Sequence, residues 1–295
     1  MTAPTTHKSL LTIILVALLG GCENASNTNP SQAETPQANL SLNQWFDARY
    51  EEELQFSPVQ LSFLGRKERN NELGSFSYAA FTEQLAWKRQ TVEELRKLYD
   101  YASLTPAEQI SDDIWVYQYE QAAASAEYFY NGLSFDQMSG IQSFIPTFLI
   151  NFHRVEDEED LRSYIARIKD VAPRMQEMLE TAQKSADAGV VSPGFALDGV
   201  IEQASAIIDG HPFTENSIKD SDLWADFQQE TQALVEQQEL TQEVADALLQ
   251  DAQSALNKHF LPTYQSIIAW AETQKDRAPN IVTGVGSQPN GAAYY

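Results

Sequence analysis

The sequence has little cysteine, histidine or positive charge. Cys22 is the only cysteine, so no intramolecular disulfide can form and ordinary packing must stabilise the fold. Lysine and arginine together number 19, against 42 aspartates and glutamates, which gives a net charge of −23 at pH 7. Because a chain this acidic repels a phosphate backbone, we expect no nucleic-acid partner.

The signatures of nucleophilic and metal-dependent catalysis are also missing. No Gly-x-Ser-x-Gly elbow, glycine-rich phosphate loop or EF-hand loop occurs in the sequence. His153, His211 and His259 lie far apart, and none of them precedes a glutamate, so the HExxH pattern of zinc peptidases is not present. We therefore predict no catalytic residue, no metal ligand and no cofactor in this chain. A zinc site assembled from separated helices is the alternative.

Two further groups of residues allow both a structural and a functional interpretation. Acidic clusters such as Glu156–Asp160 are expected to be solvated charge, with an acid–base or calcium role as the alternative. The aromatic stretch Tyr128–Phe152 is expected to pack in a core. Its alternative role is to line a groove for a peptide or another apolar ligand.

Long apolar runs are missing too, except near the start of the chain. Leu10–Leu19 is an uncharged, largely apolar run that follows Lys8. It is about half as long as a membrane-spanning helix and has the length of a secretory signal. The next residues, Leu19-Gly20-Gly21-Cys22, resemble the bacterial lipobox. We predict that residues 1–21 are a lipoprotein signal peptide and that Cys22 carries the lipid.

The polar segment after Cys22 indicates where the protein is located. Residues 22–39 have alanine as their only apolar type apart from Cys22, so burial cannot offset their ordering entropy and we expect a disordered tether. Glu23 resembles the residue that favours the outer membrane in enterobacterial sorting rules. We expect a protein of the cell envelope that its lipid anchors to the outer membrane, facing the periplasm.

Residues 40–295 show the periodicity of helices. We predict a mostly α, multi-helix domain with long amphipathic helices and at most a short terminal strand or hairpin. The expected helices cover about 41–56, 81–102, 106–130, 157–188, 193–209, 221–236 and 241–274.

Several local features of these helices are also predicted. Thr105-Pro106-Ala107-Glu108 is a capping signal, and the helix it opens has apolar residues on several sides, which predicts a central position. Pro173 and Pro262 should bend their helices. Leu133–Phe152 is expected to form short helices or a buried loop, and Ile281-Val282 a short strand.

Four segments, in this order, resemble the "domain of unknown function 885" family: Phe56–Gly65, Leu161–Ile208, Lys258–Trp270 and Gly284–Tyr295. Members of that family look like gluzincin-type zinc metallopeptidases, mostly helical, in which an HExxH helix and a later glutamate hold zinc. The metal polarises the peptide carbonyl and activates a water. The HExxH motif of the family lies beyond its GxxxxPxGxxYY segment, and no residue follows Tyr295 here.

The resemblance therefore implies an amino-terminal, channel-forming half of a lipid-anchored zinc-metallopeptidase-like protein. Such a protein would hydrolyse short peptides, and this half would be inactive alone, with zinc bound by the missing carboxyl-terminal half. The alternative is a complete, non-catalytic helical lipoprotein that binds a ligand or protein partner in the envelope. The sequence leaves enzyme status and oligomeric state open.

By the same resemblance, the last residues are candidates for a substrate-binding strand. An edge strand can pair with an extended peptide, and a plain structural hairpin is the alternative. The candidate residues are Gly284, Gly286, Pro289, Gly291, Tyr294 and Tyr295.

Overall fold

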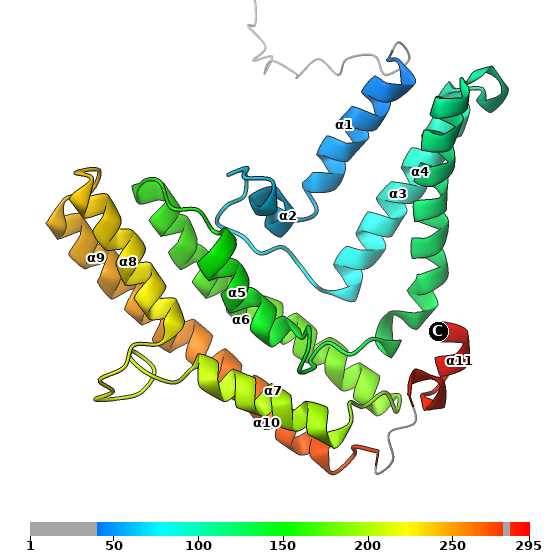
Figure 1. The fold of residues 1–295 in the computed structure, drawn as a ribbon. Helices are drawn as coiled ribbons and strands as arrows, with labels where there is room; N and C mark the ends of the chain where they lie inside the picture. Colours follow the sequence, from blue (N-terminus) through cyan, green and yellow to red (C-terminus); the bar gives the residue numbers. More distant parts are fainter. Residues whose placement is uncertain (1–39, 280–283) are drawn as a thin grey trace, which may run out of the picture. The chain divides into compact units, whose positions relative to one another are not determined.

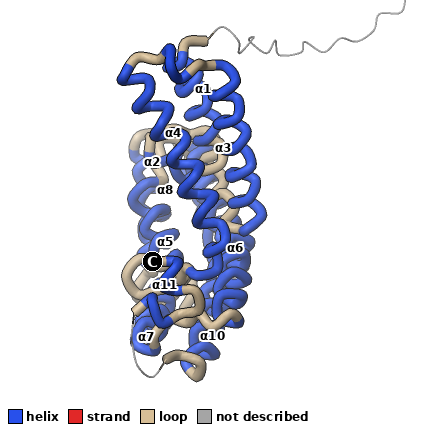
Figure 2. The backbone as a smooth tube through the Cα atoms, turned by 90° about the vertical axis from the view of Figure 1, so that its right-hand side faces the viewer, coloured by secondary structure: helices blue, strands red, loops and turns tan. Residues whose placement is uncertain are grey.

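The computed structural model describes residues 40–279 and 284–295, and within them the fold consists of helices and loops (Figures 1 and 2). The predicted mostly α fold is confirmed. The helices are α1 (Leu42–Leu54), α2 (Pro58–Phe63), α3 (Tyr78–Leu98), α4 (Pro106–Ser125), α5 (Ile141–Phe152), α6 (Glu158–Asp187), α7 (Gly194–Ile207), α8 (Asp222–Glu236), α9 (Gln242–Ala255), α10 (Leu261–Lys275) and α11 (Gly291–Tyr294). The predictions for residues 1–21, for Cys22, for the tether up to residue 39 and for Ile281-Val282 lie outside the described residues.

The capping signals in the sequence determine where several helices begin. The Thr105 hydroxyl accepts the Glu108 N–H, and the Glu108 carboxylate accepts the Thr105 N–H at 2.9 Å, which is the reciprocal pair of a capping box. Ser41 and Gln44 make the same pair at the start of α1. At the start of α6, the Asp157 carboxylate accepts the Asp160 N–H at 3.0 Å. Local hydrogen bonds of this kind explain why the predicted starts of these helices agree with the structure.

The larger core is built on α6, the longest helix. Its residues Leu161, Tyr164, Ile168 and Met175 recur at helical spacing and are fully buried. Helices α8, α9 and α10 pack against α6, and α7 lies along α10 (Figure 1). Helix α6 is continuous through Pro173.

A smaller core joins α1, α3 and α4. Trp45 of α1 and Trp115 of α4 meet edge to face, with ring centroids 5.7 Å apart, and Val92 and Leu95 of α3 pack beside them. The Trp115 Nε1–H donates to the Thr91 hydroxyl at 3.0 Å. These contacts hold the three helices together.

The expected central position of α4 is wrong. Ile110, Ile114 and Tyr117 are 61%, 53% and 59% exposed. The physical reason is that, among the described residues, α4 packs in the core through Trp115 and Val116, so apolar residues on its other sides are left exposed. The α-helix also ends at Ser125 and continues as a 3₁₀ turn, Ala126–Asn131, rather than reaching Tyr130 as an α-helix.

The helix expected over about 241–274, with a bend at Pro262, is instead divided into two helices just before that proline. Helix α9 ends at Ala255, a π-helical turn spans Leu256–Phe260, and α10 begins at Leu261. Proline has no N–H and its ring crowds the carbonyl four residues earlier, so a wider π turn accommodates it.

Within Leu133–Phe152, which we expected to form short helices or a buried loop, Ile141–Phe152 form the helix α5. Pro193 is the N-cap residue of α7, and the hydroxyl of the preceding Ser192 donates to the Phe135 carbonyl at 3.4 Å.

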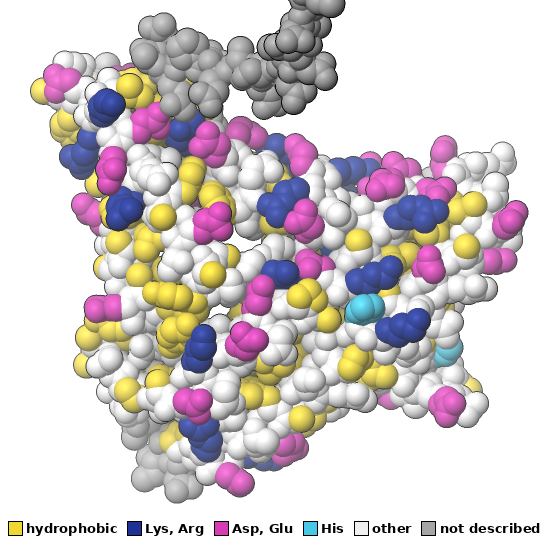
Figure 3. Space-filling view, turned by 180° about the vertical axis from the view of Figure 1, so that it is seen from behind, with side chains coloured by type: hydrophobic (Ala, Val, Ile, Leu, Met, Phe, Trp, Pro, Cys, Tyr) yellow, Lys and Arg dark blue, Asp and Glu magenta, His cyan; other side chains and the backbone are white. Residues whose placement is uncertain are grey.

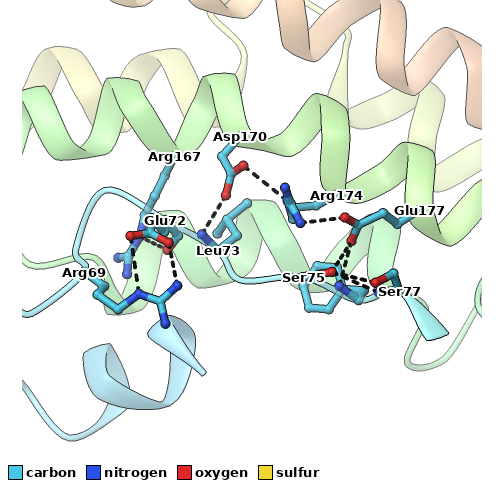
Figure 4. A network of polar contacts seen from close by, with 10 residues as sticks. Arg69, Glu72, Leu73, Ser75, Ser77, Arg167, Asp170, Arg174 and Glu177 are labelled. Carbon is cyan, nitrogen blue, oxygen red and sulfur yellow. Dashed lines mark hydrogen bonds and ion pairs between the residues drawn. The ribbon is translucent and has the colours of Figure 1, made fainter. Parts of the chain in front are cut away.

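Polar side chains of α6 hold the connection between α2 and α3 (Figure 4). The Asp170 carboxylate accepts the Leu73 N–H at 2.9 Å, and the Glu177 carboxylate accepts the Phe76 N–H at 2.8 Å. Arg174 lies between these acids and pairs with both, at 3.2 Å and 2.6 Å. These contacts hold the connection between α2 and α3 against α6.

Candidate functional site

The predicted substrate-strand residues do not form a strand in the described segment 284–295. Val285–Ser287 form a 3₁₀ turn and Gly291–Tyr294 form α11. Asn290 has a left-handed φ of 57°, and a Cβ on Gly291 would lie 1.9 Å from the Val285 carbonyl oxygen. This close approach folds the segment onto itself, so its backbone is not extended as an edge strand would be.

The structure does bring part of this segment against the rest of the fold. The Asn131 side-chain amide donates to the Pro289 carbonyl at 2.7 Å, and the Tyr294 ring lies 6.0 Å from that of Tyr128. Pro289 also lies against Gly189, whose added Cβ would be 3.2 Å from the proline ring. Tyr295 is 97% exposed. None of the six candidate residues lines either of the two large cavities among the described residues.

The three histidines lie in separate places. His153 follows α5, His211 follows α7, and His259 lies in the π turn. Among residues 40–279 and 284–295, no group of three or more histidine, cysteine or acidic side chains could hold a metal ion. The described residues therefore do not fit the zinc that the family resemblance implies.

Buried His153 has a structural role. Its Nδ1 accepts from the Arg167 guanidinium at 2.8 Å, and its Nε2–H donates to the Asp160 carbonyl at 2.9 Å. Burial lowers the pKa of His153 to about 4, so the ring is neutral at pH 7. Arg167 also donates to the Ser62 hydroxyl at 2.7 Å and to the Glu72 carbonyl at 3.0 Å. This network joins α2, the following loop and α6.

A groove of about 900 Å³ lies between α1, α3 and α4, with the start of α2 at one end. We call it the α1–α4 groove. Its lining residues recur at helical spacing on each wall. Those from α1 include Phe46, Asp47 and Tyr50, those from α3 include Phe81, Leu85 and Lys88, and those from α4 include Ser111, Ile114, Trp115, Gln118 and Ala122.

Lys88 connects the three walls of the α1–α4 groove. Its ammonium lies 3.2 Å from the Glu53 carboxylate, 3.2 Å from the Gln118 side-chain oxygen and 3.2 Å from the centroid of the Trp115 ring. The Lys88 side chain is only 7% exposed. Burial lowers the pKa of Lys88, and the Glu53 carboxylate opposes that shift. Because all its donors are engaged, Lys88 braces the groove and offers no free positive charge to a ligand.

Polar and apolar side chains both line the groove, and we call the polar ones its rim and the apolar ones its floor. Asp47 is exposed and makes no ion pair or hydrogen bond with another described residue. The side-chain amides of Asn43, Gln60 and Gln84 also line the groove. Amide and carboxylate groups can pair with peptide N–H and C=O groups, whereas the aromatic and aliphatic floor can bury an apolar side chain.

A second cavity, of about 670 Å³, adjoins the groove because Phe81 and Gln84 line both. Phe56, Trp87 and Phe129 also line it, so one member of the aromatic stretch Tyr128–Phe152 faces a cavity. Together the two cavities have room for an elongated ligand.

On the face drawn in Figure 3, apolar side chains gather toward the left, and acidic and basic side chains are interspersed over the rest.

The sequence did not predict this groove. Its walls come from three helices. Lys88 is 35 residues from its partner Glu53 and 30 residues from its partner Gln118 along the chain. The one sequence feature related to the groove is the surplus of apolar residues on α4, from which we predicted a central position for that helix.

Comparisons with known proteins give the relationships of the chain. The model of the family described as "Bacterial protein of unknown function (DUF885)" matches residues 58–295. A crystal structure described as that of "the putative lipoprotein from Colwellia psychrerythraea" superposes with a TM-score of 0.68 at 16% sequence identity. The match covers 86% of this chain and 45% of that one, so the chain spans less than half the length of this relative. None of the curated proteins that were compared matches the chain.

At this low identity, the superposition shows a shared fold. In the part of the chain that the structure describes, no helix has both the length and the apolar character needed to span a bilayer.

Proposed function

Because the chain belongs to the DUF885 family of bacterial proteins of unknown function, we propose that it is the peptide-binding, helical portion of a lipid-anchored envelope protein. The observation that carries this proposal is the α1–α4 groove, which three helices wall and the Lys88 brace holds open. The amide-bearing rim and apolar floor of the groove have the chemistry of a peptide site. In this proposal α1, α3 and α4 form one side of a substrate channel.

The anchor is proposed from the sequence. Cys22 would carry acyl chains and residues 23–39 would link them to the helical domain, facing the periplasm from the outer membrane. The description of the Colwellia structure as a lipoprotein supports the lipid anchor. Tyr294 and Tyr295 are 41% and 97% exposed, and they stay candidates for contact with a bound peptide.

Hydrolysis is the further part of the proposal. The related structure is more than twice as long as the matched region, and the described residues contain no group of three or more side chains that could hold a metal ion. We therefore expect a zinc-bearing segment outside this chain to complete a peptidase. The purified chain should bind peptides without cleaving them and should hold no stoichiometric zinc. Metal analysis showing one tightly bound zinc per chain would contradict this division of roles.

Matched variants on α4 test peptide binding. Ala122 lines the α1–α4 groove, whereas Ala124, two residues on, is exposed elsewhere on the helix. Ala122→Trp should fill the end of the groove and weaken the binding of labelled tetra- to hexapeptides, measured by fluorescence anisotropy, by about tenfold. Ala124→Trp is the control and should bind as the parent does. Equal affinities for the parent and both variants would refute the groove as the site.

A non-catalytic, partner-binding lipoprotein is the second candidate function. The observation in its favour is the exposed stripe of Ile110, Ile114 and Tyr117 on α4. If this stripe docks a protein, Ile110→Glu combined with Tyr117→Glu should abolish a specific cross-link in cells while peptide binding is unchanged. Loss of peptide binding in the Ala122→Trp variant, without any cross-link to the stripe, would favour the first function.

A further inference from the structure

We propose that the α1–α4 groove selects peptides in which a positive group, either a basic side chain or a free amino terminus, lies beside an apolar side chain. This inference rests on the proposed function, because it names the class of peptide that the groove would accept. The positive group would bind at Asp47 and Tyr50, and the apolar side chain would occupy the floor at Leu85 and Ile114.

The charges that line the groove favour a cation. They are Asp47, Glu53 and Lys88, and they sum to one negative charge. Lys88 and Glu53 already neutralise each other at 3.2 Å. The remaining carboxylate, Asp47, is solvent-exposed on the rim and has no ionic partner among the described residues. A ligand cation therefore meets one uncompensated carboxylate, whereas an anionic ligand has no uncompensated cation to meet in the groove.

Aromatic rings next to Asp47 add to this preference. Tyr50 lies one turn after Asp47 on α1, so both side chains are on one face of the helix, and Phe46 borders them. The Tyr50 side chain is 47% exposed and stacks on no other described ring. A carboxylate beside an open aromatic face suits an ammonium or guanidinium group. The same groove already holds one ammonium over a ring, that of Lys88 over Trp115.

The floor accounts for the apolar half of the ligand. Ile114 is 53% exposed on the α4 wall, and Leu85 and Leu54 face the same cavity from α3 and α1. An apolar side chain placed there would cover part of the exposed surface of Ile114. The acidity of the whole chain, −23, also attracts cationic peptides in the approach to the groove.

The experiment compares three peptides that differ at one position: acetyl-Lys-Leu-Ala-Leu-amide and its glutamine and glutamate counterparts. Binding to the whole mature chain is measured by calorimetry at low and high salt. The lysine peptide should bind about fivefold more tightly than the glutamine peptide, and the glutamate peptide should bind most weakly. The preference should shrink at high salt, because Asp47 is exposed.

Asp47→Asn is the test variant and Asp251→Asn the matched control. Asp251 is an exposed acid on α9 and does not line the groove. In the Asp47→Asn variant, the ratio of the affinity for the lysine peptide to that for the glutamine peptide should fall about threefold. In Asp251→Asn this ratio should be unchanged. Circular dichroism of both variants checks that the helices are intact.

The possible failures are distinguishable. If the three peptides bind equally well, or if Asp47→Asn leaves the lysine preference unchanged, the selectivity proposed here is wrong and peptide binding by the groove stands. If none of the three peptides, nor any of the labelled tetra- to hexapeptides, binds to the chain, both the selectivity and the proposed function are wrong.

Discussion

Breaking the Glu53–Lys88 pair from either side should have unequal effects on stability. In Glu53→Gln, the Lys88 ammonium stays buried, with a side chain 7% exposed, and loses its counter-charge. In Lys88→Met, the apolar stem is kept and the carboxylate of Glu53, whose side chain is 32% exposed, can take up water instead. The two variants remove the same 3.2 Å contact and leave different groups unpaired.

The magnitudes follow from which group is left unpaired. Removing one partner of a buried pair costs about 3–5 kcal/mol, and an exposed pair is worth about 0–1 kcal/mol. Because the Lys88 side chain is almost fully buried, the cost for a buried pair applies, and Glu53→Gln should lower the free energy of unfolding by about 3 kcal/mol. Lys88→Met leaves a partly hydrated acid and gives up the contact with the Trp115 ring, which together should cost about 1.5 kcal/mol. The double variant should resemble Lys88→Met.

Urea unfolding of the three variants and the parent, followed by circular dichroism, measures these differences. The pH dependence gives an independent check. Because burial lowers the pKa of Lys88 in the folded state, the unfolded chain binds more protons as the pH approaches 10.5. The parent should therefore gain stability relative to Lys88→Met as the pH rises toward that value. If Lys88→Met costs more than Glu53→Gln, the assignment of Lys88 as the desolvated partner is refuted.

Three further predictions concern other parts of the chain. Burial raises the pKa of Asp226 to about 6, above its ordinary 3.8, so the parent should lose stability as the pH rises from about 4 to 6. Asp226→Asn should remove that loss and be about 2 kcal/mol more stable than the parent at pH 7 by urea unfolding; an equal difference at pH 4 and pH 7 would contradict this. Gly291→Ala places a Cβ 1.9 Å from the Val285 carbonyl and should expose the last residues to limited proteolysis, whereas Gly286→Ala, with no atom within 4 Å, should not. Cys22→Ser should abolish labelling by a radioactive fatty acid in cells, and continued labelling would refute the lipid site.

The features that sequence predicted well depend on local contacts. The start of α4 depends on Thr105 and Glu108, which are three residues apart, and the buried stripe of α6 depends on a regular helical period. Neither requires knowledge of the rest of the fold. The interruption before Pro262 is also local, because a proline affects only the preceding turn.

The features that sequence missed depend on distant partners. Nothing in the sequence around Lys88 distinguishes it from an ordinary lysine on the polar face of a helix, because Glu53 and Gln118 are 35 and 30 residues away. In the tail, Pro289 meets Asn131 and Gly189, which are 158 and 100 residues away. The order of residues alone does not specify such contacts, so the groove and the folded tail became visible only in three dimensions.

The wrong prediction of a central position for α4 and the presence of the α1–α4 groove have the same cause. The apolar residues of α4 outnumber those that α1 and α3 can cover, so Ile114 is left on the wall of the groove, 53% exposed.

If Ile114 served the core, Ile114→Ser would measurably lower the free energy of unfolding of the domain. Because it is exposed, we expect a change in unfolding free energy below about 0.5 kcal/mol and a clear loss of affinity for leucine-containing peptides. Val116→Ser, in the buried core of the same helix, should do the reverse: destabilise by about 2 kcal/mol and leave the peptide affinity of the folded chain unchanged. Equal stability losses in the two variants would show that the exposed apolar residues of α4 do not form a binding wall.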